Sequence, residues 1–340
     1  MDRNKFKWQL PFLLFLIVGT VLILKKQEPY RTEQGLIFGT IYKVTYQSKH
    51  SLKNAIEDEL HKVDCSLSPF NKESVITRIN NNTDNAADSM MTEVFSLAEK
   101  ISEETSGAFD ITVAPLVNAW GFGFKNAENI DSAAIDSMRQ FVGFKKVKLE
   151  NGKIVKQDPR IMLDCSAIAK GYGVDRIAKL FNRKGIRNYM IEIGGELVLK
   201  GESPKKDAWR IGINKPIDDS LAVNQQLQTV LKISNAGMAT SGNYRNFYYK
   251  DGKKYAHTID PRTGYPVQHN ILSSTVIADD CATADAYATS FMVLGLDSAK
   301  IICNKHPEID AYFIYTKDDG NTDVYFTGGM KKYLDNNINH

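Results

Sequence analysis

The stretch that decides the fold is His257-Thr258-Ile259-Asp260-Pro261-Arg262-Thr263-Gly264-Tyr265-Pro266, followed further along by Ala282-Thr283-Ala284-Asp285-Ala286-Tyr287-Ala288-Thr289. In the first segment, Asp-Pro fixes the entry of a turn, Gly264 permits positive φ and Pro266 stops a helix. The second segment predicts a helix. Residues four apart share a helical face, so Asp285 and Thr289 would reach one point. Together the turn and the helix predict a site for a hard metal ion and a phosphate ester.

The helix alone leaves two interpretations open. A carboxylate and a hydroxyl are hard oxygen ligands that suit Mg²⁺ or Ca²⁺ and not zinc. Two such ligands do not fill an octahedral shell, so backbone carbonyls, water or a substrate phosphate would supply the rest. In the structural alternative, Thr289 bonds back to the carbonyl of residue 285, and Asp285 lies favourably near the helix start. Taken alone, the two residues favour this structural alternative.

The turn also has two interpretations. A rigid turn that carries His257, Asp260, Arg262 and Thr263 can present a base and donors to a phosphate. The alternative is a polar surface turn between two strands, with His257 as a structural histidine. Of the charged residues, we expect Asp260 to orient the turn and Arg262 to contribute little to phosphate binding.

Three further segments are candidates for ligand contacts. Asp164 and Lys170 lie at the start of a long helix predicted over 166–184. Free N–H groups at a helix start attract anions. Asp164 is equally well explained as the N-cap of this helix. The pair Gly194-Gly195 allows close backbone approach but more often marks a bulge or turn. Trp120-Gly121-Phe122-Gly123 can stack a planar ligand or simply pack in a core. We find no Walker A loop, Rossmann Gly-x-Gly-x-x-Gly or Gly-x-Ser-x-Gly elbow.

The elements do not alternate regularly, and many neighbouring strands are linked as hairpins. This pattern favours an α+β fold with mixed, largely antiparallel sheets and packed helices. Helices are expected over 51–63, 92–104, 135–142, 166–184 and 282–294, and strands over 38–46, 146–149, 153–156, 189–193, 196–200, 209–213, 229–234, 245–249, 272–277, 311–315 and 322–326.

The overall composition argues against several classes of function. Of 340 residues, 43 are basic and 40 acidic, giving a formal charge of +3, which argues against a nucleic-acid binder. The four cysteines (Cys65, Cys165, Cys281 and Cys303) form no Cys-x-x-Cys pair, so a zinc or thioredoxin-like site is disfavoured. Their pairing cannot be chosen from the sequence, and most are expected to be buried small apolar residues.

The N-terminus differs from the rest. Basic residues precede an apolar run from Leu10 to Leu24, which Lys25 and Lys26 close without a small-x-small cleavage site. We therefore favour an uncleaved signal anchor over 1–26, although the run is short for a span of roughly 20 residues. A cleaved signal peptide and a buried helix are the alternatives. A polar linker is expected over 27–34 and a catalytic domain over 35–335.

The joint order of these segments resembles the ApbE family, the FAD:protein FMN transferases, from about Gly35 to about Tyr333. The most specific likeness is the Asp-Pro-Arg-Thr-Gly segment with its following Ala-Asp-Ala helix. The other segments that carry it are Phe38-Gly39-Thr40, residues 106–115, Trp120 to Gly123, Asp164 to Asp175, Ile193 to Glu196, and Ala239-Thr240-Ser241-Gly242.

The resemblance implies roles for single residues. Mg²⁺ would be bound by the Asp285 carboxylate, the Thr289 hydroxyl and the Ala167 carbonyl. FAD would be contacted by Phe38, Phe70, Trp120, Gly121, Phe122, Asp164, Lys170 and the backbone of Ile259. The chain departs from the family in places. Phe38 replaces a usual methionine, Phe70 an often-present tyrosine, and Ala288 a second Asp of some members, while Glu192 and Glu196 replace a more usual Asn and Asp.

The implied reaction moves the FMN part of FAD to a Ser or Thr hydroxyl of a partner protein and releases AMP, with His257 as candidate general base. A magnesium-dependent FAD pyrophosphatase and a non-catalytic flavin carrier are the alternatives. The anchor suggests a place at the cytoplasmic membrane with the catalytic domain on the extracytoplasmic, periplasmic side. Acceptors would then be subunits of membrane redox complexes.

Overall fold

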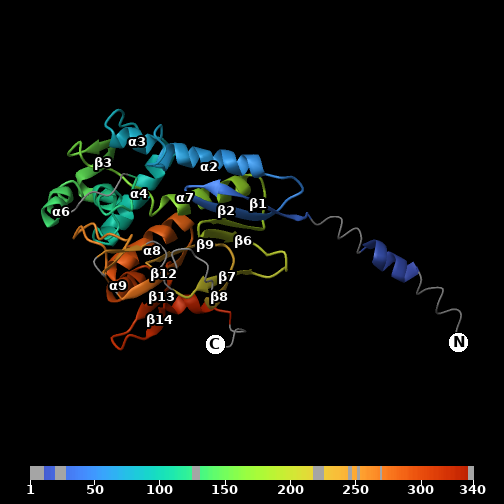
Figure 1. The fold of residues 1–340 in the computed structure, drawn as a ribbon. Helices are drawn as coiled ribbons and strands as arrows, with labels where there is room; N and C mark the ends of the chain where they lie inside the picture. Colours follow the sequence, from blue (N-terminus) through green and yellow to red (C-terminus); the bar gives the residue numbers. More distant parts are fainter. Residues whose placement is uncertain are drawn as a thin grey trace.

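A computed structural model describes residues 11–19, 28–124, 131–216, 226–243, 247–250, 253–268 and 270–335. Its centre is an eight-stranded sheet with the order β1-β2-β5-β6-β9-β12-β13-β14 (Figure 1). Every neighbouring pair in this sheet is antiparallel. The expectation of an α+β fold with largely antiparallel sheets is therefore confirmed.

The strands of the central sheet are β1 (Tyr30–Ile37), β2 (Thr40–Gln47), β5 (Tyr189–Ile193), β6 (Glu196–Lys200), β9 (Ala236–Gly242), β12 (Ile271–Ala278), β13 (Asp310–Thr316) and β14 (Thr322–Phe326). Three two-stranded ribbons accompany it: β3 (Val147–Glu150) with β4 (Lys153–Lys156), β7 (Trp209–Asn214) with β8 (Leu227–Ile233), and β10 (Phe247–Lys250) with β11 (Lys253–Ala256). The helices are α2 (Lys53–Leu67), α3 (Val75–Asn80), α4 (Ser89–Glu104), α5 (Ala114–Ala119), α6 (Ser132–Arg139), α7 (Ala169–Arg183), α8 (Cys281–Leu294) and α9 (Leu296–Lys305).

The two faces of the sheet are covered differently. Helices α7 and α8 pack on one face, and α2 and α4 pack on these helices. In β2, Tyr42, Val44 and Tyr46 point into this core, whereas Ile41 and Lys43 point outward because side chains alternate along a strand. On the other face, the β7–β8 ribbon closes a second, smaller core around Trp209 and Leu231 (Figure 1).

Small residues let α8 approach its neighbours closely. A Cβ added at Gly171 would lie 2.5 Å from the carbonyl oxygen of Cys281, and one at Gly237 would lie 2.4 Å from the backbone carbonyl carbon of Asp280. The buried Asp175 of α7 accepts hydrogen bonds from the amides of Cys281 and Ala282 at 2.9 and 2.8 Å. These bonds satisfy amides that the first turn of a helix leaves free. The start of α8 is thereby fixed against both α7 and the sheet.

Most predicted elements are present with small shifts at their ends, but three expectations need correction. The linker prediction over 27–34 is wrong from Tyr30 onward, because these residues pair with β2 along its whole length. The strand predicted over 38–46 begins only at Thr40, because Phe38 and Gly39 form the turn between β1 and β2. The helix predicted from Ser166 begins at Ala169, because Asp164 holds the preceding residues in a turn by accepting from the Ser166 amide at 2.8 Å.

The N-terminal segment is only partly described. Residues 11–19 form a helix, and the rest of the apolar run from Leu10 to Leu24 lies outside the described residues. Within the described ranges, no helix is both long and apolar enough to cross a membrane. The four cysteines are all free, and three of them are buried, as expected.

Candidate active site

A large cavity of about 1060 Å³ lies where the sheet, the start of α7, the face of α8 and the segment after β11 meet. Ten of the twelve residues singled out from the sequence line it: Phe38, Phe70, Phe122, Asp164, Ala167, Lys170, His257, Ile259, Asp285 and Thr289. Trp120 and Gly121 are not among its lining residues. Segments that lie far apart in the sequence are thus brought to one place.

The face of α8 that carries Asp285 and Thr289 forms one corner of the cavity. The Asp285 side chain is 2% exposed, and its Oδ2 accepts a hydrogen bond from the Gly171 amide at 3.1 Å. Burial raises the pKa of Asp285, while the nearby Lys170 ammonium and the Gly171 amide act in the opposite direction. The Thr289 hydroxyl lies 3.1 Å from the hydroxyl of Ser241 on β9. The Asp285 carboxylate and the Thr289 hydroxyl therefore have their positions set by neighbouring elements.

Lys170 stands between two buried carboxylates. Its Nζ donates to Oε1 of Glu196 at 2.5 Å, and the charge of Asp285 also acts on it. Burial would lower the pKa of Lys170, but these two carboxylates outweigh it and raise that pKa. Burial raises the pKa of Glu196, against the effect of Lys170 and with that of Asp285. Among the described residues, Oε2 of Glu196 is a buried oxygen without a hydrogen-bond partner.

The segment after β11 is a partly buried turn that is braced by its own side chains. Arg262 donates to both carboxylate oxygens of Asp260, from Nε and Nη2 at 2.9 Å each, so its guanidinium is bound within the turn. Asp260 is 7% exposed, whereas Arg262 and Thr263 are exposed, so the turn is buried at its carboxylate and reaches the surface beyond it. Gly264 has φ +84°, and a Cβ there would lie 2.7 Å from Cγ2 of Ile135. Trp120 Nε1 donates to the Gly264 carbonyl at 2.8 Å, which gives this indole a role in holding the turn.

The half-buried His257 stands at the start of this turn and lines the cavity. Its ring meets that of Phe122 edge to face, with centroids 6.4 Å apart. The aromatic ring of Phe70 lies at the same cavity and is 68% exposed. An imidazole and several aromatic rings thus share a cavity with the carboxylate and hydroxyl of α8, which suits a planar ligand that carries phosphates.

Two site residues were not selected from the sequence. Glu196 was noted only as a departure beside Gly194-Gly195, and Ser241 only as part of a longer segment. Both line the cavity. Their positions depend on the pairing of β6 with β9, which brings Leu197 opposite Met238. No local pattern in the sequence signals that pairing.

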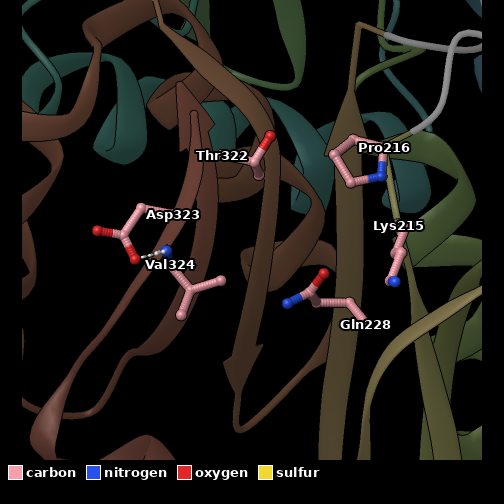
Figure 2. Close-up of a pocket in the computed structure, with 6 residues that line it drawn as sticks. All are labelled: Lys215, Pro216, Gln228, Thr322, Asp323 and Val324. Atoms are coloured by element: carbon pink, nitrogen blue, oxygen red, sulfur yellow. Dashed lines mark hydrogen bonds between the residues drawn. The ribbon is translucent and has the colours of Figure 1, made fainter. Parts of the chain in front are cut away.

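A second, smaller cavity of about 360 Å³ lies away from this chemistry (Figure 2). It is lined by Lys215, Pro216, Gln228, Thr322, Asp323 and Val324, and it shares no lining residue with the larger cavity. The Asp323 carboxylate accepts from the Val324 amide at 2.8 Å (Figure 2). Of the residues that the structure describes, no imidazole and no second carboxylate line this smaller cavity. The candidate site is therefore the larger cavity.

Comparison with known proteins gives one consistent family. Residues 38–313 match the profile of the ApbE family. An FAD:protein FMN transferase of Haemophilus influenzae is 36% identical over 305 residues, which cover 84% of this chain and 86% of that protein. The FAD:protein FMN transferase of Escherichia coli K12 is 33% identical over 331 residues, covering 91% of this chain and 93% of that protein.

Solved structures agree with the sequence comparison. The flavin transferase ApbE from Vibrio cholerae superimposes with a TM-score of 0.81 at 32% identity, covering 90% of this chain and 100% of that chain. The apo form of the flavinyl transferase ApbE from Pseudomonas stutzeri gives a TM-score of 0.78 at 28% identity, covering 90% of this chain and 97% of that chain.

Proposed function

This chain belongs to the ApbE family and is an FAD:protein FMN transferase, and from that premise we propose how its cavity performs the transfer. FMN is moved to a Ser or Thr hydroxyl of the acceptor protein, and Mg²⁺ at the α8 corner assists the reaction. The hydroxyl oxygen forms a new bond to the FMN phosphorus. The bond from that phosphorus to the bridging oxygen breaks, and AMP leaves with the electron pair. The observation that carries the proposal is the oxygen face of Asp285 and Thr289 beside Lys170 in one large cavity.

The residues of this corner fit a magnesium ion. Asp285 and Thr289 offer a carboxylate and a hydroxyl from one helical face, and Ala167, whose carbonyl would be the third ligand, lines the same cavity. These are hard oxygen donors of the kind that Mg²⁺ takes, with phosphate oxygens and water completing its shell. No cluster of three or more His, Cys, Asp or Glu side chains suited to a metal occurs in the described part of the chain. The proposed site is therefore a lean one that depends on backbone and substrate oxygens.

The charges around Lys170 also favour a cation. Two buried carboxylates, Asp285 and Glu196, face a single ammonium group, and one Glu196 oxygen has no partner among the described residues. Buried charges are costly unless they are paired. A divalent cation would offset this excess and, when bound, would neutralise the charge that develops on the pyrophosphate.

His257 is our candidate for receiving the proton of the acceptor hydroxyl. Its imidazole lines the same cavity as Asp285, on a turn that the Asp260–Arg262 pair and the Trp120 indole hold in place. Phosphoryl transfer depends mainly on positioning and charge stabilisation, so this bracing bears directly on rate. Phe38, Phe70, Phe122 and the backbone of Ile259 would hold the flavin ring, and Asp164 and Lys170 its polar groups.

The N-terminal segment supports a proposal about the cellular location of the protein. Its basic and apolar pattern favours an anchor in the cytoplasmic membrane, with the catalytic body on the extracytoplasmic side. Acceptors would then be subunits of membrane redox complexes exposed on that side.

The test incubates the full chain with FAD, Mg²⁺ and a purified acceptor domain from a membrane redox subunit that carries one target threonine. The expected result is in-gel flavin fluorescence and a mass gain equal to FMN, both abolished by EDTA and by replacing the target threonine with alanine. Free FMN and AMP without an adduct would instead indicate a pyrophosphatase, and unchanged bound FAD would indicate a carrier. Transfer at full rate after exhaustive metal removal would contradict the magnesium assignment.

A further inference from the structure

The reaction requires a protein, and not only a small molecule, to reach the cavity. A hydroxyl on the acceptor must come close to the corner formed by Asp285 and Thr289, which are 2% exposed and half-buried, respectively. The surrounding surface of the acceptor must therefore lie across the cavity mouth. Residues at this mouth that remain exposed and apolar are candidates for contact with it.

The hairpin of β1 and β2 presents such residues. Leu36 and Ile41 lie directly opposite each other in the antiparallel register, and their side chains are 80% and 60% exposed. Cross-strand partners share one face of a sheet, and Lys43 follows Ile41 on that face. Ile41 and Lys43 both line the cavity. Leu36, Ile41 and Lys43, here called the hairpin patch, thus form an apolar pair with one lysine at its edge beside the site.

The tip of this hairpin is held in place. Phe38 and Gly39 form its two-residue turn, with φ values of +50° and +71°, as in the tight turns that suit the twist of paired strands. A Cβ added at Gly173 would lie 3.0 Å from Cε2 of Phe38, so this ring rests close to α7. Anchoring Phe38 inward leaves Leu36 and Ile41 pointing outward on a preformed surface. A preformed surface loses little conformational entropy when a partner binds.

We propose that the hairpin patch is the docking surface for the acceptor protein and receives apolar side chains that flank its target hydroxyl residue. This inference rests on the proposed function. An occupant that covers Ile41 also covers part of the cavity wall. A permanent contact with a second copy or with lipid would obstruct the mouth, whereas an acceptor that leaves after each turnover would not. An apolar centre with a polar edge is the usual composition of a specific protein interface.

The test uses the full chain with saturating FAD and Mg²⁺, and with an acceptor domain that the wild-type chain flavinylates. The variant Leu36→Thr removes the more exposed member of the apolar pair, which does not line the cavity, and keeps a residue that favours strands. We expect the KM for the acceptor to rise about tenfold or more, with kcat, the Kd for FAD and the melting temperature near wild type. Ile301→Thr, at a 56% exposed position on α9, is the matched control and should leave all four unchanged.

An unchanged acceptor KM in Leu36→Thr would overturn the docking surface and leave the transfer reaction intact, because the wild-type chain flavinylates the same acceptor. A parallel loss of FAD affinity would also overturn it, since the patch would then act on the flavin. A photocrosslinking residue at Leu36 gives a second measurement. Crosslinks to the acceptor at Leu36 but not at Ile301 support the patch, whereas crosslinks only between copies of this chain assign the surface to self-association.

Discussion

The amide of Gly171 donates to Oδ2 of Asp285 at 3.1 Å and joins the first turn of α7 to the middle of α8. This hydrogen bond gives a partner both to an amide that the helix start leaves free and to a buried carboxylate. It leaves the other carboxylate oxygen of Asp285 for the cavity. The proposed metal site and the packing of the two helices therefore depend on the same contact.

Removing the charge of Asp285 should abolish metal-dependent transfer without unfolding the chain. Asp285→Asn keeps an acceptor for the Gly171 amide but loses the carboxylate ligand, so transfer should fall by more than about 100-fold. Rates of flavin adduct formation at several Mg²⁺ concentrations measure this, and circular dichroism checks the fold. A variant that transfers FMN at the wild-type rate would remove Asp285 from the metal site.

A methyl group at Gly171 should separate α7 from α8. The added Cβ would lie 2.5 Å from a backbone oxygen, and overpacking of this kind costs about 1–3 kcal/mol. Gly171→Ala should lower both the free energy of unfolding in urea and the apparent affinity for Mg²⁺. Gly173→Ala is the control on the same helix, because its Cβ would meet only side-chain atoms, at 3.0 Å from Cε2 of Phe38 and 3.4 Å from Cδ1 of Ile193, and it should lose less stability than Gly171→Ala. Equal losses in the two variants would contradict this account.

The pair formed by Lys170 and Glu196 should show strong coupling. Lys170→Met leaves two buried carboxylates without their ammonium partner, which should cost about 3–5 kcal/mol of stability. Adding Glu196→Gln to that variant removes one of these charges and should recover part of the loss. A double-mutant cycle in urea denaturation measures the coupling, and simple additivity of the two changes would refute it.

Glu59 should make stability depend on acidic pH. Burial acts to raise the pKa of Glu59, but hydrogen bonds from Arg176 and Lys62 outweigh it and lower that pKa below its ordinary 4.5. A lowered pKa stabilises the fold at pH values above 4.5, and this stabilisation is lost as pH falls through the folded-state pKa. Glu59→Gln should therefore be less stable at neutral pH, by about 1–3 kcal/mol, and should lose less on acidification. Asp58→Asn, at an exposed neighbouring position, should follow the wild-type pH curve; a Glu59→Gln curve parallel to wild type would contradict the assignment.

Two tryptophans offer a comparison between the site and the scaffold. Trp120 donates to the Gly264 carbonyl at 2.8 Å, whereas Trp209 donates to the Lys200 carbonyl at 3.0 Å. Replacing either by Phe removes one hydrogen bond worth about 1 kcal/mol. Trp120→Phe should lower kcat several-fold by loosening the turn that carries His257. Trp209→Phe should reduce stability with kcat unchanged, and equal kcat values in both variants would show that the turn needs no such support.

The sequence predicted those features that depend on local patterns. The turn between Asp260 and Gly264 and the shared helical face of Asp285 and Thr289 follow from short-range stereochemistry. The pairing of strands that lie far apart in the sequence could not be predicted in this way. The polar residues 30–34 predict a linker but belong to strand β1 (Tyr30–Ile37), whose outer face stays exposed. Only the structure shows that Glu196 contacts Lys170 within the site. Trp120 donates a hydrogen bond to the turn and does not line the cavity.

The antiparallel pairing of β2 with β5 places Tyr42 opposite Ile193. The chain must therefore close a loop of about 150 residues, whose entropic cost comes before any gain from the contacts it allows. Folding should accordingly be slow, and the cavity should be among the last regions to form, because its walls come from both sides of this loop. FAD would bind only the finished structure and would stabilise it by mass action. A cell short of flavin would then hold less of this enzyme in its folded state, so the supply of the substrate also sets the amount of active catalyst.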